Sequence, residues 1–249
     1  GLDHRVEHVL GVDPKAVLLL RIDLHAPAFW YLLRPEDRVE YALAEPARSP
    51  HTGDLDSGVA PLRVSLASQP WRQANAAALQ ALTRHVEAAP YRDHIAGMMT
   101  ACGTYGEWHY WGFFYLPDLG PAMTEHFRTF VARQYGTPAA LSAAWGRTVR
   151  SFAAVEVPGR ERLRTGNGFL RQGQDAAWVR DYVTCHHRLV ADTLIDCCRT
   201  VKQASDNRLL AGAFHGYFFN TPWRDEAGHL EFRRVVDGPL LKQAPRGGI

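Results

Sequence analysis

The stretch at residues 94–117, HIAGMMTACGTYGEWHYWGFFYLP, changes from apolar to aromatic and polar at one point. Residues 95–102 form a short apolar run, which is typical of a strand buried on both faces. Gly103 and Gly106 interrupt the run, because glycine readily takes the backbone angles of a turn. We therefore expect Glu107 to stand just beyond the carboxyl end of this strand. In parallel α/β folds, that end of the sheet carries the ligands and catalytic groups.

Glu107 is surrounded in sequence by ring-bearing side chains. A carboxyl group beside aromatic faces is poorly solvated, which favours its protonated form and suits a general acid. Aromatic rings also offer apolar surfaces to the C–H faces of a sugar, while their N–H and O–H groups can bond its hydroxyls. The alternative is a hydrophobic plug in which Glu107 pairs with an arginine. We favour the catalytic interpretation. The neighbours are Trp108, His109, Tyr110, Trp111, Phe113, Phe114 and Tyr115.

Composition and charge narrow the class of protein. With 249 residues, of which 46% are hydrophobic, the chain can form one α/β domain or two small ones with a sizeable core. The 28 basic and 26 acidic residues are mixed along the chain, so charge gives no reason to expect nucleic acid or a membrane surface as partner. We expect a neutral partner, such as a carbohydrate substrate.

The cysteines and the chain start carry little functional signal. Cys102, Cys185, Cys197 and Cys198 show no metal-ligand spacing, and three of them fall on one predicted helix, so we expect neither a metal site nor a disulfide framework. No run of about eighteen apolar residues is present, and the first ten residues, GLDHRVEHVL, lack the regions of a signal peptide. They are typical of a helix interior. We therefore favour a cytoplasmic location and expect the chain to begin within a domain.

Two other apolar runs also become polar at one end. Residues 15–24, KAVLLLRIDL, predict a buried strand whose end carries Asp23, His25 and Trp30. Residues 209–217, LLAGAFHGY, predict another strand that ends in His215 and Tyr217. Between the first of these strands and the central stretch, residues 25–68 are rich in proline and glycine and predict a long excursion over the strand ends.

The remaining pattern alternates helices with strands. This alternation predicts a parallel sheet covered by helices, either an open doubly wound sheet or part of a (β/α)₈ barrel. No GxGxxG motif follows a strand and no phosphate loop is present, whereas polar and aromatic clusters end three strands, which favours the barrel. The predicted helices are 70–88, 121–135, a stretch of about thirty residues from near 175, and 224–236, with a helical turn at 138–145 and further strands at 151–158 and 240–244.

Several segments resemble the catalytic (β/α)₈ barrel of β-galactosidase-like glycoside hydrolases of clan A. They are SLASQPWRQANAAALQALTRHVEAAPYRDHIAGMMTACGTYGEW, LPDLGPAMTEHFRTFVARQYGTPAALSAAW, GAFHGY and GHLEFRRVVDGP. The resemblance implies retaining hydrolysis by two carboxylates, with the acid/base glutamate after the fourth barrel strand and the nucleophile after the seventh. Glu107 matches the first, Gly106 stands where many members have asparagine, and no residue matches the nucleophile.

Counting strands from this match gives a TIM-barrel domain that spans residues 1–249 and contains only the third to sixth strands. Such an incomplete barrel would leave unpaired edges and could self-associate through them. Retaining hydrolysis needs a second carboxylate, so we expect the isolated chain to be a weak glycosidase at best.

Three functions follow as hypotheses. The first is a glycoside hydrolase for β-galactoside-like sugars, with Glu107 as general acid/base and no cofactor or metal. The second is a non-catalytic carbohydrate-binding or assembly module derived from such a barrel. The third is a metal hydrolase built from Asp23, His25, His109 and His215, which no His-x-His or HExxH spacing supports. Core packing is the alternative for each aromatic residue. The candidate sugar contacts are Asp23, His25, Trp30, Trp108, His109, Tyr110, His215 and Tyr217.

Overall fold

A computed structural model of the chain describes residues 1–46, 60–112, 115–159, 173–174 and 176–215. The predicted helix at 224–236, the predicted strand at 240–244 and Tyr217 lie outside these residues. Among the helices that are described, none is both long and apolar enough to cross a membrane.

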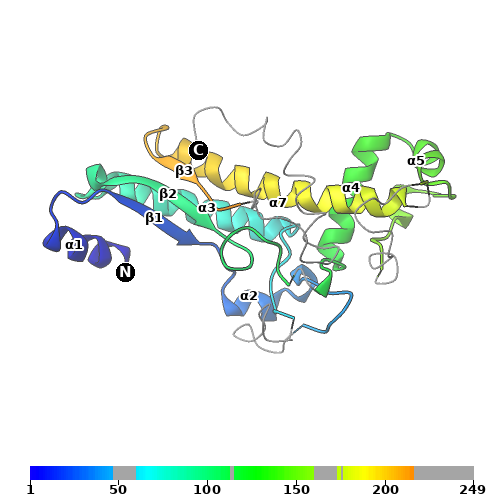
Figure 1. The fold of residues 1–249 in the computed structure, drawn as a ribbon, viewed down its shortest axis with the longest axis horizontal. Coiled ribbons are helices and arrows are strands. Elements are labelled where there is room, and N and C mark those ends of the chain that lie inside the picture. Colours follow the sequence, from blue (N-terminus) through cyan, green and yellow to red (C-terminus); the bar gives the residue numbers. More distant parts are fainter. Residues whose placement is uncertain (47–59, 113–114, 160–172, 175, 216–249) are drawn as a thin grey trace.

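Three parallel strands form a sheet toward one end of the described fold, in the order β1 (Leu18–Asp23), β2 (Ile95–Ala101) and β3 (Leu210–Gly212) (Figure 1). Leu20 lies opposite Met98, which in turn lies opposite Ala211, so the strands run in register. The sequence-based prediction of parallel strands is confirmed. Because the strands are parallel, their carboxyl ends meet on one edge of the sheet.

Two long helices cover this sheet. Helix α3 (Gln69–Ala88) begins after Ser68, whose hydroxyl accepts a hydrogen bond from the Trp71 backbone N–H at 3.2 Å. Helix α7 (Ala177–Ala204) packs against α3 and runs from the sheet to the other end of the molecule (Figure 1). The apolar faces of α3, α7 and β2 meet in the core, where Leu79, Met98 and Val201 are fully buried.

Two helices form a separate layer at the far end of α7. Helix α4 (Pro121–Tyr135) begins with a proline and ends at Gly136, and α5 (Pro138–Trp145) follows directly (Figure 1). These bounds confirm the predictions. Proline suits the first turn of a helix because its missing N–H has no intrahelical partner there, and Gly136 takes the φ of 72° that ends α4.

The predicted strand at 151–158 is wrong. This stretch contains a single 3₁₀ turn, η4 (Phe152–Ala154), and no strand is assigned there. Its backbone carbonyls are bound by side chains instead of a neighbouring strand: Arg128 donates to the carbonyl of Val155 at 2.8 Å, and Trp178 donates to that of Glu156 at 2.9 Å. Weak alternation without a pairing partner did not make a strand.

The remaining elements surround the sheet. Helix α1 (Leu2–Val12) lies beside β1, and a 3₁₀ turn, η2 (Arg92–His94), leads into β2 (Figure 1). The described part of the excursion contains a short helix, α2 (Ala28–Leu33), and a 3₁₀ turn, η1 (Pro35–Asp37). Isolated bridges then pair Arg38 with Val64 and Tyr41 with Pro117, so the excursion contacts itself and the segment that precedes α4.

Candidate functional site

The loop that follows β2 is a tight hairpin with Glu107 near its tip. The backbone N–H of Trp108 donates to the carbonyl of Cys102 at 2.7 Å, and that of Thr104 donates to the carbonyl of His109 at 2.9 Å. Four residues of the hairpin have positive φ angles, and two of them, Tyr105 and Trp108, are not glycine. Clusters of unusual backbone angles are found preferentially at functional sites. The hairpin therefore holds Glu107 in a defined position beyond the middle strand.

Glycine and an arginine fix the shape of this hairpin. A Cβ atom on Gly103 would lie 2.1 Å from the carbonyl oxygen of His109, and one on Gly106 would lie 2.4 Å from a guanidinium nitrogen of Arg21. The same guanidinium donates to the carbonyl of Tyr105 at 2.8 Å. Arg21, the one charged side chain inside its aliphatic run, thus reaches from β1 to hold the loop of Glu107.

Glu107 has a histidine partner within its own loop. Its carboxylate lies 3.7 Å from Nε2 of His109, and the two side chains are 28% and 19% exposed. This distance permits an ion pair but is longer than a hydrogen bond. Glu107 is therefore reachable from solvent while remaining partly shielded, as a group that must meet a substrate and transfer a proton requires.

The end of β1 brings a second carboxylate and histidine to the same rim. Asp23 lies 3.1 Å from Nε2 of His25 and also accepts a hydrogen bond from the backbone N–H of His25. The imidazole packs edge-on against Trp111, with ring centroids 4.7 Å apart, and the Arg63 guanidinium lies 5.2 Å from the same indole. Burial lowers the pKa of His25; the Arg63 charge acts in the same direction and Asp23 opposes it.

The end of β3 contributes a third histidine. His215 follows the strand by three residues, and burial lowers its pKa to about 4, with a smaller contribution from His109. His215 and His109 therefore lie close enough to interact electrostatically. Residues from β1, β2 and β3 thus share one rim, as the strand ends predict. Tyr217 lies outside the described residues.

Three of the aromatic residues predicted to contact a sugar interact with other parts of the protein instead. Trp108 and Tyr110 are each 1% exposed; the indole N–H of Trp108 donates to the carbonyl of Thr100 at 2.9 Å. Trp30 is half-buried and donates to Asp37 at 3.1 Å. The positive φ of Trp108 turns its side chain beneath the hairpin, into the core. As a correction to the sequence-based list, we assign Trp108 and Tyr110 to core packing, which was their alternative.

A buried aspartate that the sequence did not reveal anchors the chain behind the rim. Asp118 is fully buried, and its carboxylate accepts hydrogen bonds from the Tyr110 hydroxyl at 2.8 Å and from the backbone N–H groups of Gly120 and Glu40 at 2.8 and 3.1 Å. The hydroxyl of Tyr182 on α7 bonds the Asp118 backbone. Burial raises the pKa of Asp118, while these hydrogen bonds act against the rise. Asp118 is therefore a structural anchor.

Neither of the other carboxylates near α4 in sequence suits the role of nucleophile. Asp118 is enclosed in the core, and the Glu125 side chain is 72% exposed on α4, 3.5 Å from Arg128. Within the described ranges, no three His, Cys, Asp or Glu side chains come together in a way that could hold a metal ion. All four cysteines are free thiols. Asp23, His25, His109 and His215, named for the metal-hydrolase hypothesis, thus do not form such a ligand group in the structure.

Comparison with known proteins supports the fold. Neither a protein-family model nor a curated protein sequence matches the chain. Among solved structures, the β-galactosidase of Bacillus circulans sp. alkalophilus matches with a TM-score of 0.60 and 14% identity over 89% of this chain and 33% of its own. The β-galactosidase of the psychrophilic Marinomonas ef1 matches with a TM-score of 0.51 and 18% identity over 81% of this chain and 28% of its own.

A third match is the catalytic domain of β-amylase from Paenibacillus polymyxa, with a TM-score of 0.58 and 16% identity over 87% of this chain and 53% of that domain. The chain thus spans about a third or less of the two β-galactosidases and about half of the β-amylase domain. At these identities the likeness concerns the fold. The described residues have the α/β fold of TIM-barrel glycoside hydrolases, represented by three parallel strands with the helices that pack on them.

Proposed function

We propose that the chain is part of a glycoside hydrolase that cleaves β-galactoside-like bonds by a retaining mechanism, with Glu107 as general acid/base. One observation carries the proposal: Glu107 stands beyond the carboxyl end of the middle strand, between Asp23 and His25 on one side and His215 on the other. In barrel enzymes, catalytic side chains come from the ends of several neighbouring strands. The fold shared with β-galactosidases supports the same interpretation.

The rim residues have different roles in the proposed reaction. Glu107 protonates the glycosidic oxygen as the bond breaks, and then removes a proton from water in the second step. Burial lowers the pKa values of His25 and His215, so both imidazoles remain neutral near pH 7 and add no positive charge to the rim. The carboxylate of Asp23 accepts from hydroxyls only. Together these groups match a neutral, hydroxyl-rich substrate.

The second carboxylate of the mechanism, which the resemblance places after the seventh barrel strand, has no counterpart that we find in the 249-residue sequence. A retaining enzyme places its nucleophile roughly 5 Å from the acid/base carboxyl, on the opposite face of the sugar. Without it, general acid catalysis contributes only about 10²- to 10⁴-fold. We therefore expect weak or undetectable cleavage of activated galactosides by the 249-residue chain alone.

The test compares Glu107→Gln with Glu125→Gln in the longest in-frame product that contains residues 1–249. Hydrolysis of an aryl β-D-galactoside should fall about 10²- to 10⁴-fold in the first variant and stay unchanged in the second, because Glu125 is exposed on α4. Calorimetry with galactose should show that Glu107→Gln still binds sugar. Full activity of Glu107→Gln would remove this residue from the mechanism.

The second candidate is a non-catalytic carbohydrate-binding or assembly module. It is favoured by the position of Asp118, whose carboxylate is buried and hydrogen-bonded instead of facing the rim. Galactoside binding without turnover of any aryl glycoside, in a product that includes the missing carboxylate, would select this module. Formation of a covalent adduct with a fluorosugar would select the hydrolase and identify the nucleophile.

A further inference from the structure

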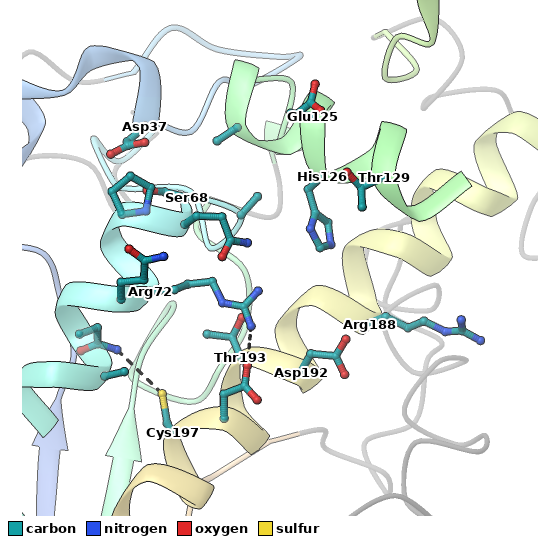
Figure 2. A pocket seen from close by; sticks show the side chains of 18 of the residues that line it. Asp37, Ser68, Arg72, Glu125, His126, Thr129, Arg188, Asp192, Thr193 and Cys197 are labelled. Carbon is teal, nitrogen blue, oxygen red and sulfur yellow. Dashed lines mark hydrogen bonds and ion pairs between the residues drawn. The ribbon is translucent and has the colours of Figure 1, made fainter. Parts of the chain in front are cut away.

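A cavity of about 1450 Å³ lies between α3, α4 and α7, away from the rim of Glu107 (Figure 2). None of the rim residues Glu107, Asp23, His25 and His215 lines it. Its walls come from residues at η1, the first half of α3, one side of α4 and the second half of α7. The cavity is therefore a separate feature of the molecule, built from helix faces and not from strand ends.

Of the six basic side chains that line this cavity, Arg34, Arg188 and Arg199 lie close to acidic residues, and the other three are Arg72 from α3 and His126 and Arg133 from α4. Figure 2 shows Arg72 and His126 pointing into the same space from their two helices. No described residue forms a hydrogen bond or ion pair with His126 or with Arg133. Arg72 uses one guanidinium nitrogen to contact Asp196 at 2.6 Å. Most of the donors on these three side chains are therefore without a protein acceptor among the described residues.

Each of the five acidic residues that line the cavity lies near an arginine, which for Asp196 and Asp192 includes Arg72; Glu36 and Glu125 pair with Arg34 and Arg128. Asp37 accepts from Arg34 at 2.6 Å, and Asp196 lies within 3.2 Å of Arg199 as well as beside Arg72. The remaining acid on α7, Asp192, interacts with Arg188 and Arg199 as well as Arg72.

Two positive charges act on the imidazole of His126. Burial, followed by the charges of Arg72 and Arg133, lowers the pKa of His126 to about 4, and no carboxylate acts in the opposite direction. The space next to His126 is therefore positive, although the cavity as a whole carries both signs of charge.

We propose that this cavity binds a small oxyanion, such as the phosphate or carboxylate group of a metabolite, between Arg72, His126 and Arg133. Two guanidinium groups supply planar, charge-assisted donors that match such an anion, and a neutral imidazole adds one further N–H. An oxyanion would give acceptors to the donors that now lack them and would cancel the positive potential around His126. The proposal is independent of the function assigned to Glu107.

The test is a titration of the 249-residue chain at pH 7 with inorganic phosphate, using sodium chloride at equal ionic strength as the reference. The readout is the Cε1–H resonance of His126, assigned by its absence in His126→Gln. Phosphate should shift this resonance in a saturable way, and chloride should not. Arg133→Gln should weaken phosphate binding at least tenfold. Arg133 is exposed, so this variant should keep its melting temperature.

Arg199→Gln is the matched control, because it removes the same charge from another part of the same cavity. It should change the affinity by less than twofold. A titration with acetate separates the two sources of the anion: tighter phosphate binding indicates a phosphate ester, and tighter acetate binding indicates a carboxylate. The proposal is overturned if neither anion gives a saturable shift, if chloride acts equally, or if Arg133→Gln and Arg199→Gln weaken binding to the same extent.

Discussion

The rim around Glu107 and the cavity beside α4 are assembled in different ways. Every rim residue lies within six positions of the end of a strand, and parallel pairing alone brings those ends together. The cavity residues come from helices that are far apart in the sequence, with Arg72 and His126 separated by 54 positions, and they meet only because the helices pack at particular angles. The rim is thus set by topology, whereas the cavity is set by packing.

The two regions should respond differently to amino-acid substitutions. The rim hairpin is held by backbone hydrogen bonds, by positive-φ residues and by the buried carboxylate of Asp118. The cavity is lined by paired and unpaired charges that water can reach. Substitutions behind the rim should therefore cost folding free energy, whereas substitutions in the cavity should change binding more than stability.

The largest expected effect is a loss of stability at low pH, to which histidines of both regions contribute. Burial lowers the pKa of His126 in the cavity and of His215 at the rim to about 4, that of His186 to about 3, and that of His187 well below 6.5. In the unfolded chain these groups bind protons below about pH 6.5, so stability is present above that pH and is lost as the pH falls. His126, His215 and His186 should each remove about 2 kcal/mol from the free energy of unfolding between pH 7 and pH 5, and His187 should act in the same direction.

Urea denaturation at the two pH values measures this loss, and His126→Gln should reduce it by about 2 kcal/mol. The raised pKa of Asp118 acts in the opposite direction, because that carboxyl binds a proton more readily in the folded chain. The pKa values of Glu40 and Asp192 are raised as well, and that of His25 is lowered, so five imidazoles stand against three carboxyls and the net loss on acidification remains. Equal stability at pH 7 and pH 5 would show that these histidines are not held neutral.

The second prediction concerns the anchor behind the rim. Asp118→Ala should lower the free energy of unfolding by about 3–5 kcal/mol, because the hydroxyl of Tyr110 and two backbone N–H groups would be buried without an acceptor. Asp118→Asn keeps an acceptor oxygen and should lose less. Glu125→Ala, in the wall of the cavity, should change stability by less than about 0.5 kcal/mol. Equal losses for Asp118→Ala and Glu125→Ala would erase the contrast between the two regions.

Much of the rim could be predicted from the sequence, because its signals are local. Apolar runs that become polar at one end placed Asp23, Glu107 and His215, and a proline and a glycine marked both ends of α4. Local signals could not give the direction of a side chain. Trp108 follows Glu107 directly, yet its positive φ sends the indole into the core.

Neither the buried anchor Asp118 nor the cavity could be predicted from a local sequence pattern. An aspartate two residues before a glycine and three before a helix-opening proline suggests a local bond to the Gly120 N–H, but the partners Tyr110 and Tyr182 come from other elements. Arg72, His126 and Arg133 lie on exposed or half-buried helix positions that read as ordinary surface. Their convergence depends on how α3 and α4 pack, which helical periodicity does not determine.

The third prediction compares two glycines with similar backbone angles. Gly103 in the hairpin has a φ of 76° and Gly136 at the end of α4 has a φ of 72°, so alanine is strained at both. A Cβ on Gly103 would lie 2.1 Å from the carbonyl oxygen of His109, whereas nothing lies within 4 Å of one on Gly136. Gly103→Ala should therefore cost about 2–4 kcal/mol and Gly136→Ala about 1 kcal/mol by urea denaturation. Equal costs would mean that the hairpin can relax.

The smallest expected effect lies in the cavity, where Arg72 contacts Asp196 with side chains 17% and 52% exposed. A double-mutant cycle with Arg72→Ala and Asp196→Ala should give a coupling of about 0.5–1 kcal/mol in chloride, as for other partly solvated pairs.

Phosphate sharpens this measurement, because a ligand that binds only the folded chain stabilises it. Arg72→Ala should become more destabilising in phosphate, since it removes a donor to the anion, and Asp196→Ala should become less destabilising, since it removes a nearby negative charge. Identical cycles in phosphate and chloride would mean that Arg72 serves only its ion pair, and the contrast between a preformed rim and a ligand-dependent cavity would then rest on the hairpin alone.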